Sequence, residues 1–234
     1  MFNFQTSVYC LKKRIIYCLF RSKRKQTFTY CGSEYGGFSV ADIIRNIKQP
    51  IVYSFGIGED LTFSEEMIDQ FGAEVYAFDP TPKSIEYVKK SKLFANSHFH
   101  FYPWGISDRD GKTEFYLPEN DDYVSGSVIV HNDVRKESIK VDMRSLKSIM
   151  SQLEHNNIDL LKMDVEGSEF EVIHSLSYSE CEKVGQICLE IHERFFDKPI
   201  AMLWHLLHEM KKRKFVLVNV SKQLDTVTFI KDCN

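Results

Sequence analysis

Residues 51–80 read IVYSFGIGEDLTFSEEMIDQFGAEVYAFDP, and this stretch decides the fold of the chain. It begins with a short run of β-branched and aromatic residues, which predicts a buried strand. Gly56 and Gly58 end that strand, and apolar residues at helical spacing follow: Phe63, Met67, Ile68 and Phe71. Gly72 stands where a helix C-cap is expected, and a second apolar strand ends at Asp79. A strand, a glycine turn, a helix, a strand and an acid form the nucleotide-binding βαβ pattern.

The glycine turn and the acid suggest how a ligand binds. Glycines allow a tight turn and let a ligand approach the backbone at the carboxyl ends of the strands. Asp79 follows the first glycine by about 20 residues, the spacing at which an acid accepts hydrogen bonds from a ribose diol. The structural alternative is an ordinary α/β turn followed by a capping aspartate.

The residues after the glycines favour one nucleoside ligand over another. A dinucleotide fingerprint needs a third glycine, but Leu61 stands at that position. Glu59 and Asp60 would repel a pyrophosphate, whereas they suit a ligand with a cationic end. S-adenosylmethionine carries a sulfonium, an ammonium and a ribose diol, so the sequence favours it over NAD. The predicted cofactor-binding residues in this stretch are Phe55, Gly56, Gly58, Asp60 and Asp79.

Length and composition fit one α/β domain preceded by a basic segment. The chain has 234 residues, 43% of them hydrophobic and 27% charged, which is typical of a globular protein. Residues 1–33 hold seven lysines and arginines and no acid, so they carry +7 of a net charge of −3 and leave −10 on the rest. We therefore predict a basic N-terminal helical arm at 1–33 and one α/β domain at 34–234.

The basic arm has two interpretations. Apolar residues recur at helical spacing in residues 1–26, with basic residues between them. The first interpretation is an amphipathic helix packed on the domain, and the second is a weak contact with a membrane surface or a partner. The apolar run at 15–20 is too short to cross a bilayer, and the segment lacks a cleavable signal pattern. Six scattered cysteines without C-x-x-C spacing indicate reduced thiols, so we expect a cytoplasmic protein, peripheral to the membrane in the second interpretation.

Several shorter segments complete the predicted order of elements. Residues 40–47 read as a short helix, and 98–107 contain a third strand that ends near Trp104. Trp104 is a candidate for stacking on the cofactor adenine, with core packing as the alternative. Polarity and glycine predict a loop at 119–126. Further strands and the final hairpin are expected at residues 112–117, 127–130, 138–142, 215–220 and 226–230.

A second group of residues indicates where chemistry takes place. Residues 158–167, IDLLKMDVEG, form an apolar strand that ends in Asp164 and Glu166, and GQICLEIH ends in Glu190 and His192. The carboxyl ends of parallel strands meet at one edge of a sheet, so we expect these four side chains near Gly56 and Asp79. They are the candidate catalytic residues, with His192 as a neutral general base. A structural ion-pair network is the alternative.

The chain resembles the FkbM-type methyltransferases, which depend on S-adenosylmethionine. The resemblance covers roughly residues 35–231 and rests on these motifs: YGGFS, SFGIGED, AFDPTP, GISDRDGKTEFY, LLKMDVEGSEFEVI and LEIHERF. It implies a class I methyltransferase (Rossmann-like) fold, a three-layer α/β sandwich with a mostly parallel seven-stranded sheet and an antiparallel C-terminal hairpin. It also implies that Gly56, Gly58 and Asp79 bind the cofactor, and that Asp164 and Glu166 belong to the active-site edge.

The resemblance and the residues together predict an S-adenosylmethionine-dependent O-methyltransferase. The expected acceptor is a hydroxyl on a small molecule or sugar, with no nucleic-acid partner. Asp164 and Glu166 are candidates for holding the acceptor or a divalent cation, although the sequence does not identify a metal site. Two alternatives are an NAD-dependent oxidoreductase and a non-catalytic binding protein on a methyltransferase fold.

Overall fold

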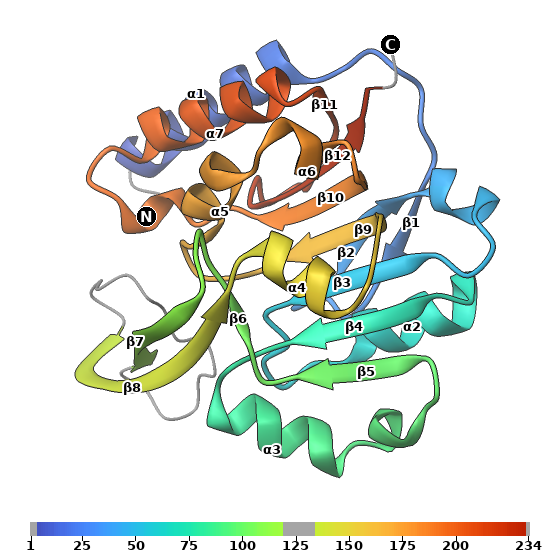
Figure 1. The fold of residues 1–234 in the computed structure, drawn as a ribbon. Coiled ribbons are helices and arrows are strands. Elements are labelled where there is room, and N and C mark those ends of the chain that lie inside the picture. The colour runs from blue at the N-terminus through green and yellow to red at the C-terminus, as the bar shows by residue number, and fades with distance from the viewer. Residues whose placement is uncertain (1–3, 119–133, 233–234) are drawn as a thin grey trace.

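A seven-stranded sheet forms the centre of the computed structural model, which describes residues 4–118 and 134–232 (Figure 1). The strand order is β11-β12-β10-β9-β3-β4-β5, and β12 runs antiparallel to its neighbours β10 and β11. The strands are β3 (Ile51–Phe55), β4 (Glu74–Phe78), β5 (Phe99–Tyr102), β9 (Ile158–Met163), β10 (Val184–Glu190), β11 (Phe215–Val220) and β12 (Thr226–Lys231). The predicted fold class, a mostly parallel sheet with a C-terminal antiparallel hairpin, is confirmed.

Helices cover both faces of the sheet and make three layers (Figure 1). One face packs against α1 (Phe4–Phe20), α4 (Leu146–Gln152), α5 (Glu169–Ser175), α6 (Tyr178–Cys181) and α7 (Pro199–Lys212). The other face packs against α2 (Thr62–Phe71), α3 (Pro82–Lys90) and a two-stranded sheet of β1 (Phe28–Cys31) and β2 (Phe38–Ala41). Three short 3-10 helices are η1 (Asp42–Asn46), η2 (Lys92–Ala95) and η3 (Glu193–Phe195).

Local sequence explains the βαβ unit at the centre. β3 and β9 are buried on both faces, as a continuous apolar run in a parallel sheet predicts. The apolar side chains of α2 at Phe63, Met67 and Ile68 are buried, and Gly72 ends the helix in the left-handed conformation. The amphipathic pattern of α2 therefore sets the path from β3 to the neighbouring β4.

A small third sheet stands beside the carboxyl edge of the central one. Its order is β6-β8-β7, with β6 (Gly105–Ile106), β7 (Gly111–Pro118) and β8 (Val134–Arg144). β7 and β8 pair antiparallel, which confirms the strands expected at 112–117 and 138–142. The loop expected at 119–126 and the strand at 127–130 lie outside the described residues.

The short helix predicted at residues 40–47 is confirmed only in part. Residues 40 and 41 end strand β2, and the 3-10 helix η1 covers residues 42–46. The Gln186 side chain, buried in β10, bonds both the amide N–H and the carbonyl oxygen of Ala41, at 3.0 and 3.3 Å. This long-range pairing holds the backbone extended where the local apolar spacing favoured a helix.

The N-terminal arm packs on the domain. In α1, Ile16 and Tyr17 are buried in the core, and the Tyr17 hydroxyl donates to the carbonyl oxygen of Leu224 at 3.1 Å. Lys13 is 6% exposed and its Nζ lies 2.5 Å from Oε1 of Glu193, which is also buried. α1 lies beside α7, as Figure 1 shows. The domain boundary at residue 33 stays a prediction, and β1 and β2 pair across it.

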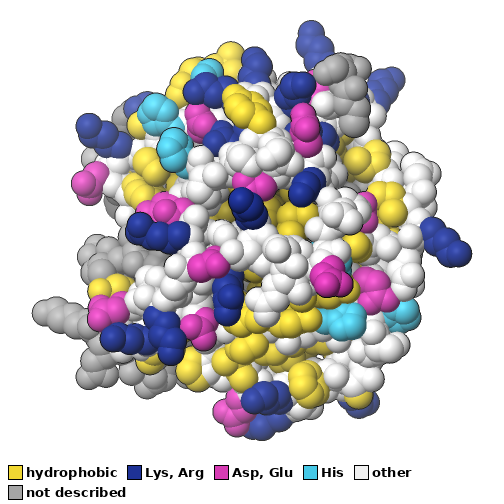
Figure 2. Space-filling view, in the orientation of Figure 1, with side chains coloured by type: hydrophobic (Ala, Val, Ile, Leu, Met, Phe, Trp, Pro, Cys, Tyr) yellow, Lys and Arg dark blue, Asp and Glu magenta, His cyan; other side chains and the backbone are white. Residues whose placement is uncertain are grey.

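No helix in the described part of the chain has the length and apolar character to cross a bilayer. On the face drawn in Figure 2, charged side chains of both signs are interspersed. Hydrophobic side chains gather over the β4–β5 part of the sheet, which no helix covers in this view.

The glycine turn after β3 packs directly against the end of β9. Gly56 has φ of +76°, and a Cβ atom on it would lie 1.7 Å from the carbonyl oxygen of Asp164. A side chain at residue 56 is therefore excluded both by the backbone conformation and by contact with another backbone segment.

We predict that Gly56→Ala destabilises the protein far more than Gly72→Ala. Both glycines have a left-handed backbone, but a Cβ on Gly72 meets nothing within 4 Å. Gly72→Ala should cost about 1–2 kcal/mol from strain alone, whereas overpacking should bring the cost of Gly56→Ala to roughly 2–5 kcal/mol. Urea denaturation of the two variants measures the difference, and equal losses would contradict the close contact.

Candidate functional site

A cleft opens at the carboxyl ends of β3, β4 and β9, where an open α/β sheet binds its ligands. Its volume is about 880 Å³, including the space open to solvent at its mouth. The turns after these strands supply most of its wall, and further lining comes from Tyr35 and Gly36 before β2, from the start of α2 and from the small sheet. The cleft therefore combines the glycine turn with the acids that follow β9.

Asp79 holds the glycine turn in place. Its Oδ2 accepts hydrogen bonds from the amides of Ile57 and Gly58 at 2.9 and 3.0 Å. Its Oδ1 accepts from the amide and hydroxyl of Thr81 at 2.9 and 2.6 Å. Since a carboxylate has about four acceptor positions, a ribose diol has to share or displace these partners. The carboxylate is 5% exposed and lies on the cleft wall, as expected for a cofactor-binding residue.

Phe55 and Asp60 also line the cleft. The Phe55 ring stacks on Phe78 with 4.4 Å between ring centroids. Asp60 accepts hydrogen bonds from the hydroxyls of Ser33 and Thr62. These bonds join the glycine turn to the segment before β2, so Asp60 positions two walls of the cleft.

Trp104 stands apart from the other predicted cofactor-binding residues. Its ring packs on Tyr102 at 4.7 Å, and the guanidinium of Arg144 lies 5.0 Å from the ring centroid. Among the described residues the cleft is lined instead by the two that follow, Gly105 and Ile106. The structure thus places Trp104 in the core-packing arrangement that was the alternative.

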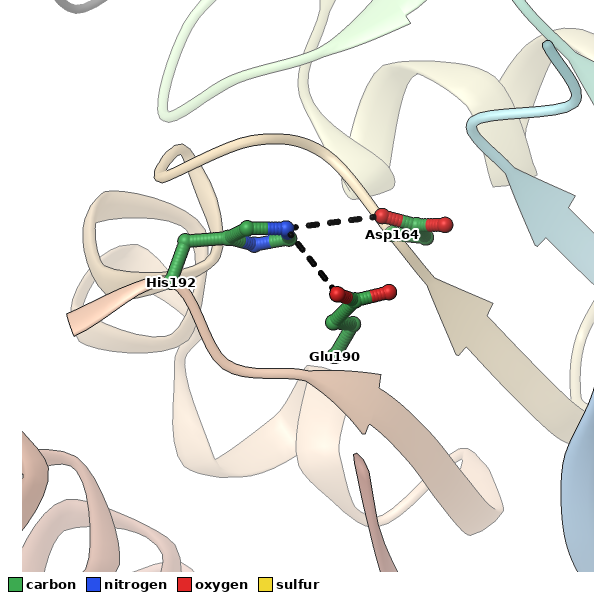
Figure 3. A group of neighbouring side chains, drawn as sticks. All are labelled: Asp164, Glu190 and His192. Carbon is green, nitrogen blue, oxygen red and sulfur yellow. Dashed lines mark ion pairs between the residues drawn. The ribbon is translucent and has the colours of Figure 1, made fainter. Parts of the chain in front are cut away.

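The four candidate catalytic side chains meet at one point, as Figure 3 shows for three of them. Nε2 of His192 lies 3.3 Å from Glu166 Oε2, 3.5 Å from Glu190 Oε1 and 3.7 Å from Asp164 Oδ1. His192 is 1% exposed, whereas the side chains of Asp164 and Glu190 are 23% exposed. Asp164 and Glu166 line the cleft, so the cluster lies directly beside it.

Glu169 is a functional-site residue that the sequence did not identify. It is fully buried at the start of α5, where its Oε2 accepts from the Gly167 amide at 2.9 Å. Its Oε1 accepts from the backbone amide of His192 at 2.7 Å. It therefore ties the turn after β9 to the end of β10. The sequence signal that could have identified Glu169 is its position in the apolar stripe of α5, where a charged residue is unexpected.

The turn after β9 has an uncommon backbone. Glu166 has φ of +49° and Gly167 has φ of +101°, so two successive residues are left-handed. This turn brings Glu166 back toward His192, which lies at the end of the neighbouring strand. Left-handed residues other than glycine are uncommon, and four more occur elsewhere in the described chain, at Gln49, Glu154, Lys214 and Leu224.

The charge state of His192 differs from the expected neutral base. Burial by itself lowers the pKa of His192, but the carboxylates of Glu169, Glu166 and Asp164 more than offset it and raise the pKa to about 10. Burial and the Asp164 carboxylate raise the pKa of Glu190. The raised pKa disfavours the neutral imidazole that a general base requires, so the role of His192 as the base stays a prediction.

Lys162 connects the two turns of the site. It is 4% exposed in β9, and its Nζ donates to the carbonyl oxygens of Phe55 and Gly56 at 3.2 and 2.6 Å. The same Nζ lies 3.8 Å from Oδ2 of Asp164. Lys162 therefore provides a hydrogen-bond donor for the backbone carbonyls at the end of β3. It also brings a positive charge to residues 164–167, the turn after β9, here called the acid turn.

Comparison with known proteins indicates the family. The family model described as the methyltransferase FkbM domain matches residues 42–217. The probable methyltransferase-like protein 24 of Homo sapiens is 29% identical over 196 residues, which cover 80% of this chain and 46% of that protein. Its Rattus norvegicus counterpart is 28% identical, with 80% and 47% covered. The chain spans about half the length of these curated relatives.

A solved structure shows the same fold. The crystal structure of methyltransferase FkbM from Methylobacillus flagellatus KT superposes with a TM-score of 0.51 at 13% identity. The match covers 78% of this chain and 44% of that protein. At this identity the likeness concerns the fold alone.

We predict that two histidines have opposite charge states in protein dialysed against a chelator. At pH 7.5 His192 should be an imidazolium, because its pKa is raised to about 10, whereas burial lowers the pKa of His155 and keeps it neutral. Two-dimensional ¹H–¹⁵N NMR of the imidazole rings distinguishes the two forms, with His192→Gln and His155→Gln assigning the signals. A neutral His192 at pH 7.5 would restore it as a candidate base.

Proposed function

This chain belongs to the FkbM methyltransferase family, and we propose that it transfers a methyl group from S-adenosylmethionine to a hydroxyl of a small molecule or sugar. The observation that carries the proposal is the cleft in which the glycine turn, Asp79 and the carboxylates of Asp164 and Glu166 face one another. The family implies S-adenosylmethionine as the cofactor.

The residues of the cleft fit this cofactor. Bare backbone at Gly56 and Gly58 leaves room for a nucleoside, and Asp79 offers a buried carboxylate to a ribose diol. Asp60 and Asp164 provide negative charge for the cationic methionine end. When bound, S-adenosylmethionine supplies an electrophilic methyl group on its sulfonium. The chain's own residues orient the two reactants and exclude water from them.

The acceptor side of the cleft is the acid turn. Asp164 and Glu166 reach the cleft from β9 and can accept a hydrogen bond from an acceptor hydroxyl. Because the surrounding carboxylates raise the pKa of His192, we assign removal of the hydroxyl proton to a carboxylate, with Glu166 as the candidate that lines the cleft. His192 then stabilises the negative charge of the carboxylates around it.

Cofactor binding is the first test. The protein should bind S-adenosylmethionine and S-adenosylhomocysteine but not NAD, as measured by titration calorimetry. Asp79→Ala should weaken binding by about 1–3 kcal/mol, the cost of losing hydrogen bonds to a charged group. Asp69→Ala, an exposed carboxylate on α2, is the matched control and should bind normally. Binding of NAD alone would support the oxidoreductase alternative.

Methyl transfer is the second part of this test. Wild-type protein incubated with methyl-labelled cofactor and a small-molecule extract should form a labelled methyl ether. Glu166→Gln should slow transfer by roughly 10²-fold or more with cofactor affinity unchanged, whereas exposed Glu171→Gln should not. Cofactor binding with no labelled product from any acceptor pool would support a non-catalytic binding protein instead. A labelled amine product would show that the acceptor is an amine and not a hydroxyl.

We also propose a weak contact between α1 and anionic membrane surfaces. While Ile16 and Tyr17 face the core, the outer side of α1 exposes Leu11, Ile15 and Leu19 at 57%, 52% and 68%. These residues are one helical turn apart and form an apolar stripe, here called the α1 stripe. Exposed basic side chains surround it or follow it: Lys12, Arg14, Arg21, Lys23, Arg24 and Lys25. An apolar stripe among lysines and arginines is typical of helices that lie on anionic lipid.

We predict that the α1 stripe determines vesicle binding. Full-length protein should float with vesicles that contain phosphatidylserine at low salt and release them at high salt, because the basic charges are screened. Replacing Leu11, Ile15 and Leu19 together by glutamine should abolish flotation. The control is glutamine at Ile43 and Ile47, which are exposed apolar residues on and beside η1. Equal flotation of both variants would contradict the proposal.

A further inference from the structure

The carboxylates around His192 are arranged for more than ion pairing with it. None of the three distances from Nε2, which run from 3.3 to 3.7 Å, is as short as a normal hydrogen bond. One ligand atom each from Asp164, Glu190 and His192 lie within 4.8 Å of one another (Figure 3). We propose that these three residues bind one divalent transition-metal cation beside the cleft.

The spacing suits a shared cation. A tetrahedral ion with nitrogen and oxygen ligands at 2.0–2.2 Å holds those atoms about 3.3–3.6 Å apart. Nε2 of His192 is 3.5 Å from Glu190 Oε1 and 3.7 Å from Asp164 Oδ1, which is close to this spacing, and the ligand atoms of all three residues lie within 4.8 Å of one another. The side chains of Asp164 and Glu190 are each 23% exposed, which gives an ion a route from solvent.

A second observation concerns the other ring nitrogen. Nδ1 of His192 is buried and has no hydrogen-bond partner among the described residues, although Oε1 of Glu169 lies 3.4 Å away. Metal-ligating histidines typically direct their second N–H at a carboxylate, which fixes the ring and leaves Nε2 free for the metal. Glu169 is held in place by the amides of Gly167 and His192. It is thus a positioning residue for the ligand.

The local charge favours a cation as well. Four carboxylates surround His192, and Lys162, which donates to two backbone carbonyls, is also 3.8 Å from Oδ2 of one of them, Asp164. Gathering carboxylates in a partly buried site is costly unless positive charge compensates them. A divalent ion that replaces the Nε2 proton of His192 would add one net positive charge among these carboxylates.

The ligand types select the class of metal. Imidazole suits zinc, iron, nickel and copper, whereas carboxylates also suit manganese and magnesium. One imidazole with two carboxylates therefore favours a transition ion over magnesium or calcium. Three protein ligands leave open coordination positions toward the cleft, as in metal sites that bind a substrate. If the proposed function is correct, an acceptor hydroxyl bound there would lose its proton more readily.

Manganese binding to the metal-free protein, without cofactor, tests this site. Free Mn²⁺ measured by electron paramagnetic resonance should show one saturable site per chain. Asp164→Asn and Glu190→Gln should each weaken that site at least tenfold, whereas exposed Glu171→Gln should not. Mg²⁺ should compete only at large excess. No saturable site, or affinities unchanged in both ligand variants, would overturn the proposal.

A spectroscopic signature of the histidine ligand can be measured in the wild-type protein, whether or not the variants fold. Electron spin-echo modulation from an imidazole nitrogen should appear in the wild-type manganese complex. It should disappear in His192→Gln and persist in His174→Gln, a control on α5. Modulation that survives His192→Gln would assign the ion to another histidine and contradict the site. Because no step uses S-adenosylmethionine, manganese binding and cofactor binding can fail separately.

Discussion

The contact between the glycine turn and the acid turn is the constraint on which the site depends. β3 and β9 are parallel neighbours, so the chains leaving them have to pass each other at the same edge. The two chain segments can pass because Gly56 has no Cβ atom. A Cβ there would lie 1.7 Å from the carbonyl oxygen of Asp164. Lys162 then bonds the carbonyl oxygens of Phe55 and Gly56 from β9. The position of the Asp164 carboxylate relative to the cofactor turn is therefore fixed by backbone contact.

Buried carboxylates perform two different tasks around that contact. Asp79 and Glu169 are nearly inaccessible and accept hydrogen bonds from backbone amides, so each one holds a turn. Asp164 and Glu190 are more exposed and have His192 as a neighbour at a distance longer than a hydrogen bond. Buried charge that is incompletely paired costs stability. Asp79 and Glu169 offset this cost through their hydrogen bonds to backbone amides. For Asp164 and Glu190, we propose that a bound cation does so.

The N-terminal arm illustrates how one helix serves two surfaces. Lys13 is drawn inward to the buried Glu193, and Ile16 and Tyr17 follow it into the core. An α-helix has 3.6 residues per turn, so residues four apart lie on the same face. When Ile16 and Tyr17 pack inward, Leu11, Ile15 and Leu19 therefore face outward. A docked helix and an exposed apolar stripe are therefore compatible, and the two interpretations of the arm do not compete.

The sequence by itself determined the fold class and which strand ends carry the candidate site residues, because apolar runs, glycine turns and terminal acids are local patterns. It placed Asp164, Glu166, Glu190 and His192 at one edge, since parallel strands end together. Only the tertiary structure decided what those groups do to one another. The raised pKa of His192 comes from carboxylates on other segments, and Glu169 became visible only when its hydrogen bonds joined two turns. Likewise, residues 40 and 41 belong to a segment with helical spacing, but pairing with β1 and with Gln186 holds these two residues extended while residues 42–46 form a 3-10 helix. Long-range contacts set charge states and override weak local preferences, and no local pattern records them.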